Sequence, residues 1–378
     1  MYKKIVVASD SFKGSLTSLQ VAQNVERAVC EVYPSCEVVK VNVADGGEGT
    51  MDALQQTLGG RKVTLSVADP LGRPVQASYV ILEDGITAVL EMSAASGLPL
   101  LTPEERNPSM TSTLGTGELI CDALAQGCRK FLVGIGGSAT NDAGMGMLHA
   151  LGYRFLDVDG AELPPVGGSM IRVASIDMSS RNPALDDVTF IVACDVKAPL
   201  YGPDGAAYVF APQKGADKEM VEALDQGLRH FAAVSSQTAG FDSSLLEGSG
   251  AAGGLGYAFR QFLGARLERG VEMVLDAIHF DEIITGSDLV ITGEGRVDNQ
   301  TLTGKTPFGV AQHALRQGIP VVAIGGSVII DPSQAQEAGF KDVLQVTPAG
   351  MPLEEAMKPE VAADNVYQTI KTFLTKYE

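Results

Sequence analysis

The stretch Lys4–Ser15, with the sequence KIVVASDSFKGS, decides the fold of this chain, because a short apolar strand ends at an acidic residue in front of a helix. The same order of strand, acidic residue or glycine pair, and helix returns further along the chain. It returns at Val43–Thr50, Gly134–Asp142, Ala193–Lys197 and Thr292–Asn299. Such alternation is typical of an α/β protein with a largely parallel sheet.

The predicted elements follow from apolar runs and helical periodicity. Strands are predicted over Lys4–Ala8, Val38–Val43, Phe131–Ile135, Phe190–Ala193, Leu289–Thr292, Val321–Ile324 and Val343–Val346. Helices are predicted over Ser18–Val32, Gly49–Leu58, Gly117–Gln126, Asp217–Val234, Phe308–Arg316 and Val361–Thr375.

The segment Val63–Met92 breaks the alternation, because it holds strand-like runs joined by a turn at Glu83–Gly85. A short turn between strands favours antiparallel pairing. We therefore predict a first domain of residues 1–66 and 280–378, interrupted by an inserted mixed α/β domain of residues 67–279.

Composition excludes several classes of function. The chain has 378 residues, a formal charge of −18 and no Trp, which argues against nucleic acid and anionic membranes as partners. Its five cysteines lack zinc-type spacing and its four histidines lack an HxxxH or HExxH pair. The N-terminus has no signal-type apolar run and no stretch is long enough to span a membrane, so we expect a cytoplasmic protein.

The acidic and glycine loops that follow the strands are expected to meet at one cleft, because ligands bind beyond the carboxyl ends of parallel strands. The acidic residues of these loops are Asp10, Asp45, Glu48, Asp142, Asp195, Glu294 and Asp298. The cations available beside them are Lys13, Arg296 and Lys305. Carboxylates with Mg²⁺, loop amides and a few cations are what phosphoryl transfer requires, and an aspartate at a strand end can act as general base.

Three glycine motifs leave alternatives open. Gly304-Lys305-Thr306 has the end of a P-loop, but the preceding glycine spacing is wrong, so Lys305 is either a solvated lysine or a phosphate ligand. Gly134-x-Gly136-x-x-Ala139 fits a dinucleotide fingerprint weakly, which keeps an NAD-dependent hydroxy-acid oxidoreductase as the alternative function. The loop Gly250–Gly256 either binds an anion at a helix N-terminus or lets a helix pack closely.

Across nearly its whole length the chain resembles the bacterial glycerate kinase family of the glycerate 2-kinase type. The matching stretches are DSFKGSL (Asp10–Leu16), ADGGEGT (Ala44–Thr50), GTGELI (Gly115–Ile120), GIGGSATNDAGMGM (Gly134–Met147), ACDV (Ala193–Val196), APQKGA (Ala211–Ala216), GAAGGLG (Gly250–Gly256) and ITGEGRVDNQTLTGK (Ile291–Lys305). Ser9 and Ala211 depart from the residues expected there in many relatives, Pro and Gly.

The resemblance implies ATP-dependent phosphorylation of D-glycerate to 2-phosphoglycerate. It also implies a Rossmann- or flavodoxin-like domain with a second domain inserted into it, and an active site in the cleft between the two.

The roles that we assign within this resemblance are hypotheses. The catalytic residues are Asp195 as general base, Lys13 and Asp45; Asp10, Ser11, Arg296 and Asp298 bind substrate; Gly136, Gly137, Ser138 and Lys305 bind the triphosphate; and Glu294 and Asp195 hold Mg²⁺. Glu294 and Asp45 follow Asp195 as candidates for the base. A non-catalytic ligand-binding protein and a kinase that forms 3-phosphoglycerate remain open, and the sequence does not choose between a monomer and a homodimer.

Overall fold

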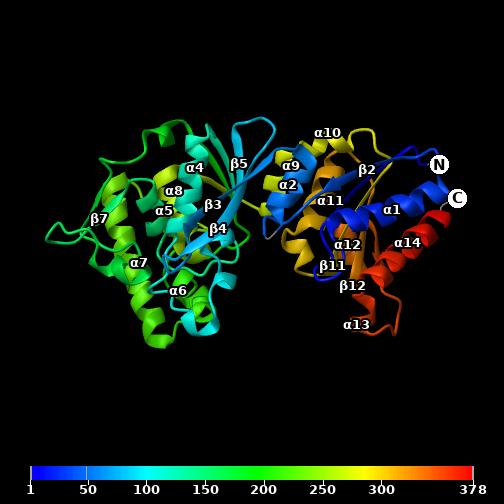
Figure 1. The fold of residues 1–378 in the computed structure, drawn as a ribbon. Helices are drawn as coiled ribbons and strands as arrows, with labels where there is room; N and C mark the ends of the chain where they lie inside the picture. Colours follow the sequence, from blue (N-terminus) through cyan, green and yellow to red (C-terminus); the bar gives the residue numbers. More distant parts are fainter. Residues whose placement is uncertain (1, 48, 377–378) are drawn as a thin grey trace. The chain divides into compact units, whose positions relative to one another are not determined.

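The computed structural model describes residues 2–47 and 49–376. Glu48, which was predicted for the cleft, lies outside the described residues. The chain divides into two compact units (Figure 1), which we call unit 1 (Met1–Asp45, Asp52–Thr57 and Val271–Glu378) and unit 2 (Gly46–Met51 and Leu58–Gly270). Each unit is built from a sheet and helices, so the predicted α/β fold class is confirmed.

Unit 1 has a parallel sheet with the strand order β13-β12-β11-β1-β2. Its strands are β1 (Lys4–Ser9), β2 (Glu37–Asn42), β11 (Leu289–Asp298), β12 (Val321–Ile329) and β13 (Phe340–Gln345). In order of appearance within the unit this is the 2-1-3-4-5 arrangement of flavodoxin-like sheets, whose strand order reverses between β1 and β11. Ligands of such sheets bind at that switch point.

Helices cover both faces of this sheet, which is why its central strand β1 is apolar on both sides. The helices of unit 1 are α1 (Ser18–Val32), most of α2 (Thr50–Leu58) and α9 (Gly270–Ala277), α10 (Phe280–Ile284), α11 (Thr306–Arg316), α12 (Pro332–Glu337), α13 (Leu353–Ala356) and α14 (Pro359–Thr375). Helices α1 and α14 bury Ile5 and Val7 in one core cluster. Val6 alternates with these residues and is also fully buried, and α11 contacts β1, β11 and β12.

Unit 2 has a mixed sheet with the order β10-β9-β6-β5-β4-β3. Its strands are β3 (Arg61–Ala68), β4 (Pro74–Ile81), β5 (Thr87–Glu91), β6 (Lys130–Gly134), β9 (Thr189–Ala193) and β10 (Arg266–Glu268), and β7 (Arg154–Leu156) pairs separately with β8 (Ser175–Asp177). Its helices are α3 (Ser93–Ser96), α4 (Leu114–Ala125), α5 (Met145–Ala150), α6 (Ala206–Phe210), α7 (Lys218–Ala239) and α8 (Ala251–Leu263). The predicted antiparallel segment is confirmed, because β4 pairs antiparallel with both β3 and β5. Strand β5 also pairs with β6, in parallel.

The division of the chain differs in detail from the predicted boundaries. Strand β3 spans the predicted boundary at residue 66, but all of it belongs to unit 2, because Arg61–Ala68 pairs along its length with β4. At the other boundary, unit 1 resumes at Val271 within α9, before the predicted residue 280.

Most predicted elements are confirmed, and two strands of unit 1 are longer than predicted. Helix α1 has the predicted bounds, with Thr17 as its N-cap accepting from the Gln20 amide. Strands β11 and β12 continue well beyond their predicted ends, to Asp298 and Ile329. The glycines after each apolar run conceal this extension, because Gly lowers strand propensity although the two strands still pair there.

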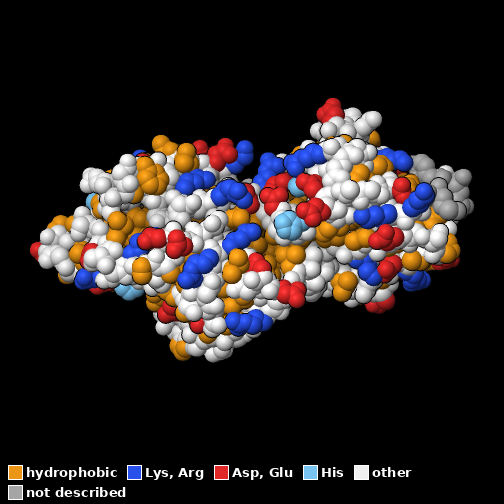
Figure 2. All heavy atoms as spheres, turned by 90° about the horizontal axis from the view of Figure 1, so that it is seen from above, with side chains coloured by type: hydrophobic (Ala, Val, Ile, Leu, Met, Phe, Trp, Pro, Cys, Tyr) orange, Lys and Arg blue, Asp and Glu red, His pale blue; other side chains and the backbone are white. Residues whose placement is uncertain are grey.

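Charged side chains are spread over the face shown in Figure 2, where Lys and Arg are interspersed with Asp and Glu. Among the described residues, no helix combines the length and the apolar character needed to cross a lipid bilayer.

Candidate active site

A pocket of about 670 Å³ lies within unit 1, at the carboxyl ends of its strands. It brings together eight of the predicted site residues: Asp10, Ser11, Lys13, Asp45, Glu294, Arg296, Asp298 and Lys305. They come from the segments after β1 and β2, from the extended end of β11 and from the start of α11. This is the switch point of the sheet, so the topology explains why residues nearly three hundred positions apart in sequence are neighbours.

Asp10 is the most buried carboxylate of this pocket. The Ser11 amide donates to its Oδ1 at 2.6 Å, and the Thr306 hydroxyl donates to its Oδ2 at 3.3 Å. Burial, together with the negative charge of Asp45, raises the pKa of Asp10 to about 6, against the opposing effects of the Ser11 amide and Lys13. A carboxyl group perturbed in this way inside a pocket is a candidate acid or base.

Glu294 lies on β11 and is held by two neighbours. The Thr301 hydroxyl donates to its Oε1 at 2.6 Å, and Lys305 Nζ lies 3.5 Å from its Oε2. Burial raises the pKa of Glu294, and both neighbours oppose that rise. Glu294 and Lys305 therefore form an ion pair in the wall of the pocket.

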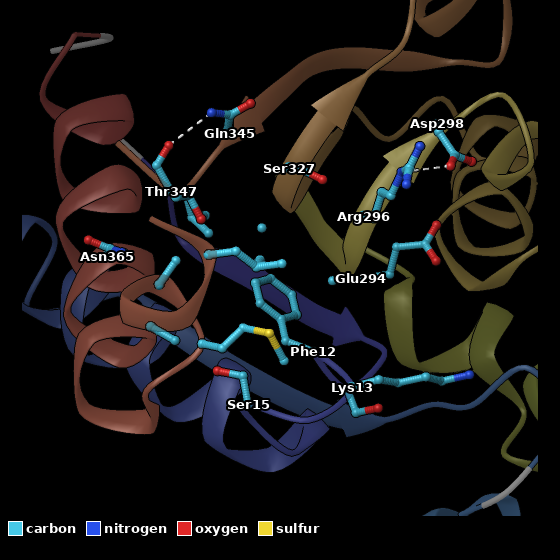
Figure 3. A pocket seen from close by; sticks show the side chains of 18 of the residues that line it. Phe12, Lys13, Ser15, Glu294, Arg296, Asp298, Ser327, Gln345, Thr347 and Asn365 are labelled. Carbon is cyan, nitrogen blue, oxygen red and sulfur yellow. Dashed lines mark hydrogen bonds and ion pairs between the residues drawn. The ribbon is translucent and has the colours of Figure 1, made fainter. Parts of the chain in front are cut away.

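The cations of the pocket are held loosely. Lys13 Nζ is 3.6 Å from Asp45, and the Lys13 side chain is 73% exposed. Arg296 Nε is 3.0 Å from Asp298, with 63% of the Arg296 side chain exposed (Figure 3). Ion pairs this exposed contribute little to stability, so both cations can exchange their partners for an anionic ligand at small cost.

The other predicted site residues belong to unit 2. Gly136, Gly137 and Ser138 follow β6, and Gly136 and Gly137 are exposed. Asp195 follows β9 and is exposed, with its Oδ1 accepting from the Gly270 amide at 3.2 Å. The five acidic and glycine loops therefore follow strands of two different sheets.

Lys214 is a buried residue of unit 2 that sequence reasoning missed. Its Nζ donates to Ser138 Oγ at 2.7 Å and to the Thr140 carbonyl at 2.6 Å. These two hydrogen bonds hold the glycine loop that follows β6 in place. Burial lowers the pKa of Lys214 to about 7, although nearby Asp142 favours the charged form. Lys214 lies within the family motif APQKGA, which is the only sign of it in the sequence. Its partners Ser138 and Thr140 are 76 and 74 positions away, so no local pattern indicates the contact.

Asp142 was predicted for the cleft, and this prediction is wrong. Its side chain is fully buried and accepts four hydrogen bonds, from the Thr113 amide and hydroxyl at 2.8 Å and from the Gly144 and Gly146 amides at 3.1 Å. The acidic residue satisfies the amides at the start of α5, a structural role.

The context of this loop does not match a dinucleotide fingerprint. That fingerprint requires a helix to open directly on the glycines, but α5 begins only at Met145. In the loop Gly250–Gly256, a Cβ on Gly253 would lie 2.0 Å from the Thr140 carbonyl oxygen. This glycine therefore permits close packing against the chain after β6, the second of the two interpretations considered for it.

The described part of the chain contains no group of three or more His, Cys, Asp or Glu side chains suited to a metal ion. Mg²⁺ in phosphoryl-transfer sites usually needs only one or two carboxylates, since phosphates and water supply its other ligands.

Comparison with known proteins defines the class of this protein. Residues 5–377 match the model of the glycerate kinase family. The chain therefore belongs to the glycerate kinase family, and the predicted resemblance is confirmed. Glycerate kinases are phosphotransferases.

Individual relatives match over nearly their full length. The chain is 47% identical to "Glycerate kinase" of Bacillus subtilis (strain 168), covering 97% of this chain and 96% of that protein. It is 45% identical to "Glycerate 2-kinase" of Escherichia coli (strain K12), covering 96% and 95%. A crystal structure from Salmonella typhimurium LT2, described under the name glycerate kinase 2, has a TM-score of 0.90 at 43% identity and covers 100% of this chain and 98% of that chain.

Proposed function

We propose that this protein transfers the γ-phosphate of ATP to the 2-hydroxyl of D-glycerate and forms 2-phosphoglycerate. The observation that carries this proposal is the family match over residues 5–377, since the family motifs supply the charged lining of the unit 1 pocket. The name of the Escherichia coli relative, glycerate 2-kinase, supports the choice of hydroxyl.

In the pocket, Arg296 is the proposed ligand of the glycerate carboxylate. A guanidinium pairs with a carboxylate through two parallel hydrogen bonds, and Arg296 is exposed enough to leave Asp298 for this purpose. Lys13 is the second cation in reach of the same pocket, and Ser11 offers a hydroxyl to the substrate.

The general base has two candidates. Asp195, our prediction from the sequence, follows a strand of unit 2 and is exposed. Asp10 is the candidate that the pocket favours, because its carboxylate is buried, lines the cavity and has a pKa near neutrality. A base with a pKa close to the working pH accepts a hydroxyl proton efficiently.

The phosphates and the metal are assigned to the remaining charged groups. Lys305 supplies a positive charge for the triphosphate, and Gly136, Gly137 and Ser138 stay predicted phosphate ligands. A single carboxylate of unit 1 suits Mg²⁺, because Asp45 and Glu294 line the same pocket as Asp10 and their negative charges act on Asp10, an effect that a cation would relieve. Bound Mg²⁺ would neutralise charge on the transferring phosphoryl group, with Glu294 as its proposed protein ligand in unit 1; Asp195 stays a predicted ligand.

We further propose that the protein works in the cytoplasm on small molecules and not on nucleic acid or membranes. The net charge of −18 supports the absence of nucleic-acid and membrane partners, since phosphate polymers and anionic lipid would be repelled.

The test is a ³¹P NMR spectrum of the product formed from D-glycerate, ATP and MgCl₂. A phosphate signal split by one proton marks the 2-phosphate and supports the proposal. Splitting by two protons marks the 3-phosphate and replaces the hydroxyl while keeping the kinase. Absence of any phosphoester, with reduction of a nicotinamide cofactor in its place, would favour the oxidoreductase.

A further inference from the structure

We propose that the apolar end of the unit 1 pocket, formed by Phe12 and by residues between Gln345 and Asn365, binds the adenine nucleoside of ATP. The inference rests on the proposed function, because it names where that kinase holds its nucleotide. It commits the nucleoside to unit 1, where the sequence motifs had indicated only phosphate ligands and substrate ligands.

The size of the pocket is the first observation. Its volume is about 670 Å³, within the range of roughly 300–1,000 Å³ in which proteins enclose drug-sized ligands. Glycerate is a three-carbon acid and would leave most of this space unused. A nucleotide would fill it.

The lining of the pocket is the second observation, because its two ends differ in chemistry. Figure 3 shows Glu294, Arg296 and Asp298 on one side of the Phe12 ring and Gln345, Thr347 and Asn365 on the other. From Gly326 to Asn365, the described lining residues include no Asp, Glu, Lys or Arg. They are Gly326, Ser327, Gln345, Val346, Thr347, Pro348, Ala349, Gly350, Met351, Leu353, Ala356, Met357, Ala362 and Asn365.

Two of the large apolar side chains at this end are exposed and are not packed into the core. Leu353 is 74% exposed and Met357 is 38% exposed, and both line the cavity. Adenine presents flat apolar faces, and methionine and aromatic side chains make favourable contacts with such surfaces. A bound base would cover these two side chains together with the edge of the buried Phe12 ring.

One polar group at this end is available for the edge of the base. The Asn365 amide donates to Met351 Sδ at 3.6 Å, and a thioether is a weak acceptor that a better one can replace. Asparagine and glutamine amides recognise adenine through a donor–acceptor pair at N6 and N7. Gln345 is less available, because it accepts from the Val328 amide and donates to the Thr347 carbonyl.

Charge fixes the orientation of the nucleotide. Lys13, Arg296 and Lys305 lie among the charged lining residues, so the triphosphate is favoured there and the base at the uncharged end. The reverse orientation would bury phosphates against methionine and leucine and place the base among carboxylates, which costs desolvation without compensation.

The first test is kinetic. Asn365→Ala and Met357→Ala should each raise KM for ATP by about tenfold, the effect of losing one good contact, and leave KM for glycerate within about twofold. Asn365→Ala should also reduce the preference for ATP over GTP. Matched controls are Gln368→Ala, an exposed amide on the same helix α14, and Met110→Ala, an exposed methionine of unit 2; both should leave the two KM values unchanged.

The second test locates the base directly with 8-azido-ATP, photolysed on the full-length protein and mapped by mass spectrometry. Labelling is expected in the tryptic peptide Asp342–Lys371, within which Pro359 blocks cleavage after Lys358, and excess ATP should abolish it. Labelling confined to unit 2, or an Asn365→Ala variant that changes only KM for glycerate, would overturn the nucleoside site while leaving the kinase intact. Labelling of this peptide in a protein without glycerate kinase activity would instead support the nucleoside site and reject the proposed function.

Discussion

The loop after β1 in unit 1 and the loop after β6 in unit 2 have similar sequence patterns but opposite environments. Asp10 lines a cavity next to other carboxylates. Asp142 accepts four hydrogen bonds from neighbouring residues of unit 2. It is not among the residues that line the pocket of unit 1. The cations differ in the same way, since Lys13 is exposed while Lys214 is buried against Ser138 and Thr140.

The comparison teaches that an acidic residue after a strand has no fixed meaning. Where the protein supplies the donors, the side chain stabilises the fold; where it leaves the group facing a pocket at an energetic cost, a ligand can supply what is missing. The two loops should therefore respond differently to the same kind of substitution.

The largest expected effect is on catalysis, from Asp10→Asn. Loss of a general base reduces kcat by roughly 10²–10⁴-fold, and in the wild type kcat/KM should fall as pH drops below about 6, the pKa of Asp10. The matched variant Asp195→Asn tests the other candidate. Near-normal turnover in Asp10→Asn, with collapse in Asp195→Asn, would return the role of base to Asp195.

The same Asp10→Asn variant should be more stable than the wild type at neutral pH. Because the pKa of Asp10 is higher in the folded protein than in the unfolded chain, protonation of Asp10 stabilises the folded state. This stabilisation is complete below the unfolded-state pKa of 3.8 and is lost as pH rises through about 6. Urea unfolding at pH 5 and pH 8 should show the advantage of the variant growing with pH. A variant that is less stable at both pH values would contradict the strain that we assign to Asp10.

In unit 2, Asp142→Ala should mainly affect stability. It removes the acceptor for four buried donors, a loss of about 3–5 kcal/mol by analogy with broken buried polar networks. The free energy of unfolding in urea measures this loss, and Asp159→Ala, an exposed aspartate of the same unit, is the control. An Asp142→Ala protein that is as stable as the wild type but inactive would contradict the structural role and assign Asp142 a role in activity.

Lys214→Met should change how stability depends on pH. A lysine pKa lowered to about 7 means that the unfolded chain, with the ordinary value of 10.5, binds more protons between these limits. The stability of the wild type relative to the variant should therefore rise as pH increases from 7 to 10, by at most about 1.4 kcal/mol per pH unit. If the difference in unfolding free energy between the wild type and the variant stays constant across this pH range, Lys214 remains charged in the folded protein.

The smallest effect is expected from Arg296→Lys, which keeps the charge but loses the paired geometry of the guanidinium. KM for glycerate should rise by about tenfold with kcat nearly unchanged. Arg172→Lys, at an exposed position of unit 2, is the control. An unchanged KM would assign the glycerate carboxylate to Lys13.

Local sequence was sufficient for much of the fold and for one side of the pocket. The apolar run Ile5–Val7 predicts β1 because both faces of a parallel strand are buried, and Asp10, Glu294 and Arg296 could be chosen because they stand at strand ends. Local sequence could not predict the pocket wall formed by Pro348–Met357, since the residues of this segment that line the pocket are uncharged and match no binding motif.

The sequence by itself determined the family, the alternation of strands and helices, and the segments that carry the chemistry, because all of these depend on neighbours along the chain. Only the tertiary structure decided which acidic residues face a pocket and which are buried and hydrogen-bonded within the protein. Lys214 and Ser138 are 76 positions apart, and Thr306 and Asp10 are 296 apart. Burial, and the pKa shifts that follow from it, arises from such distant partners, so no local pattern records it.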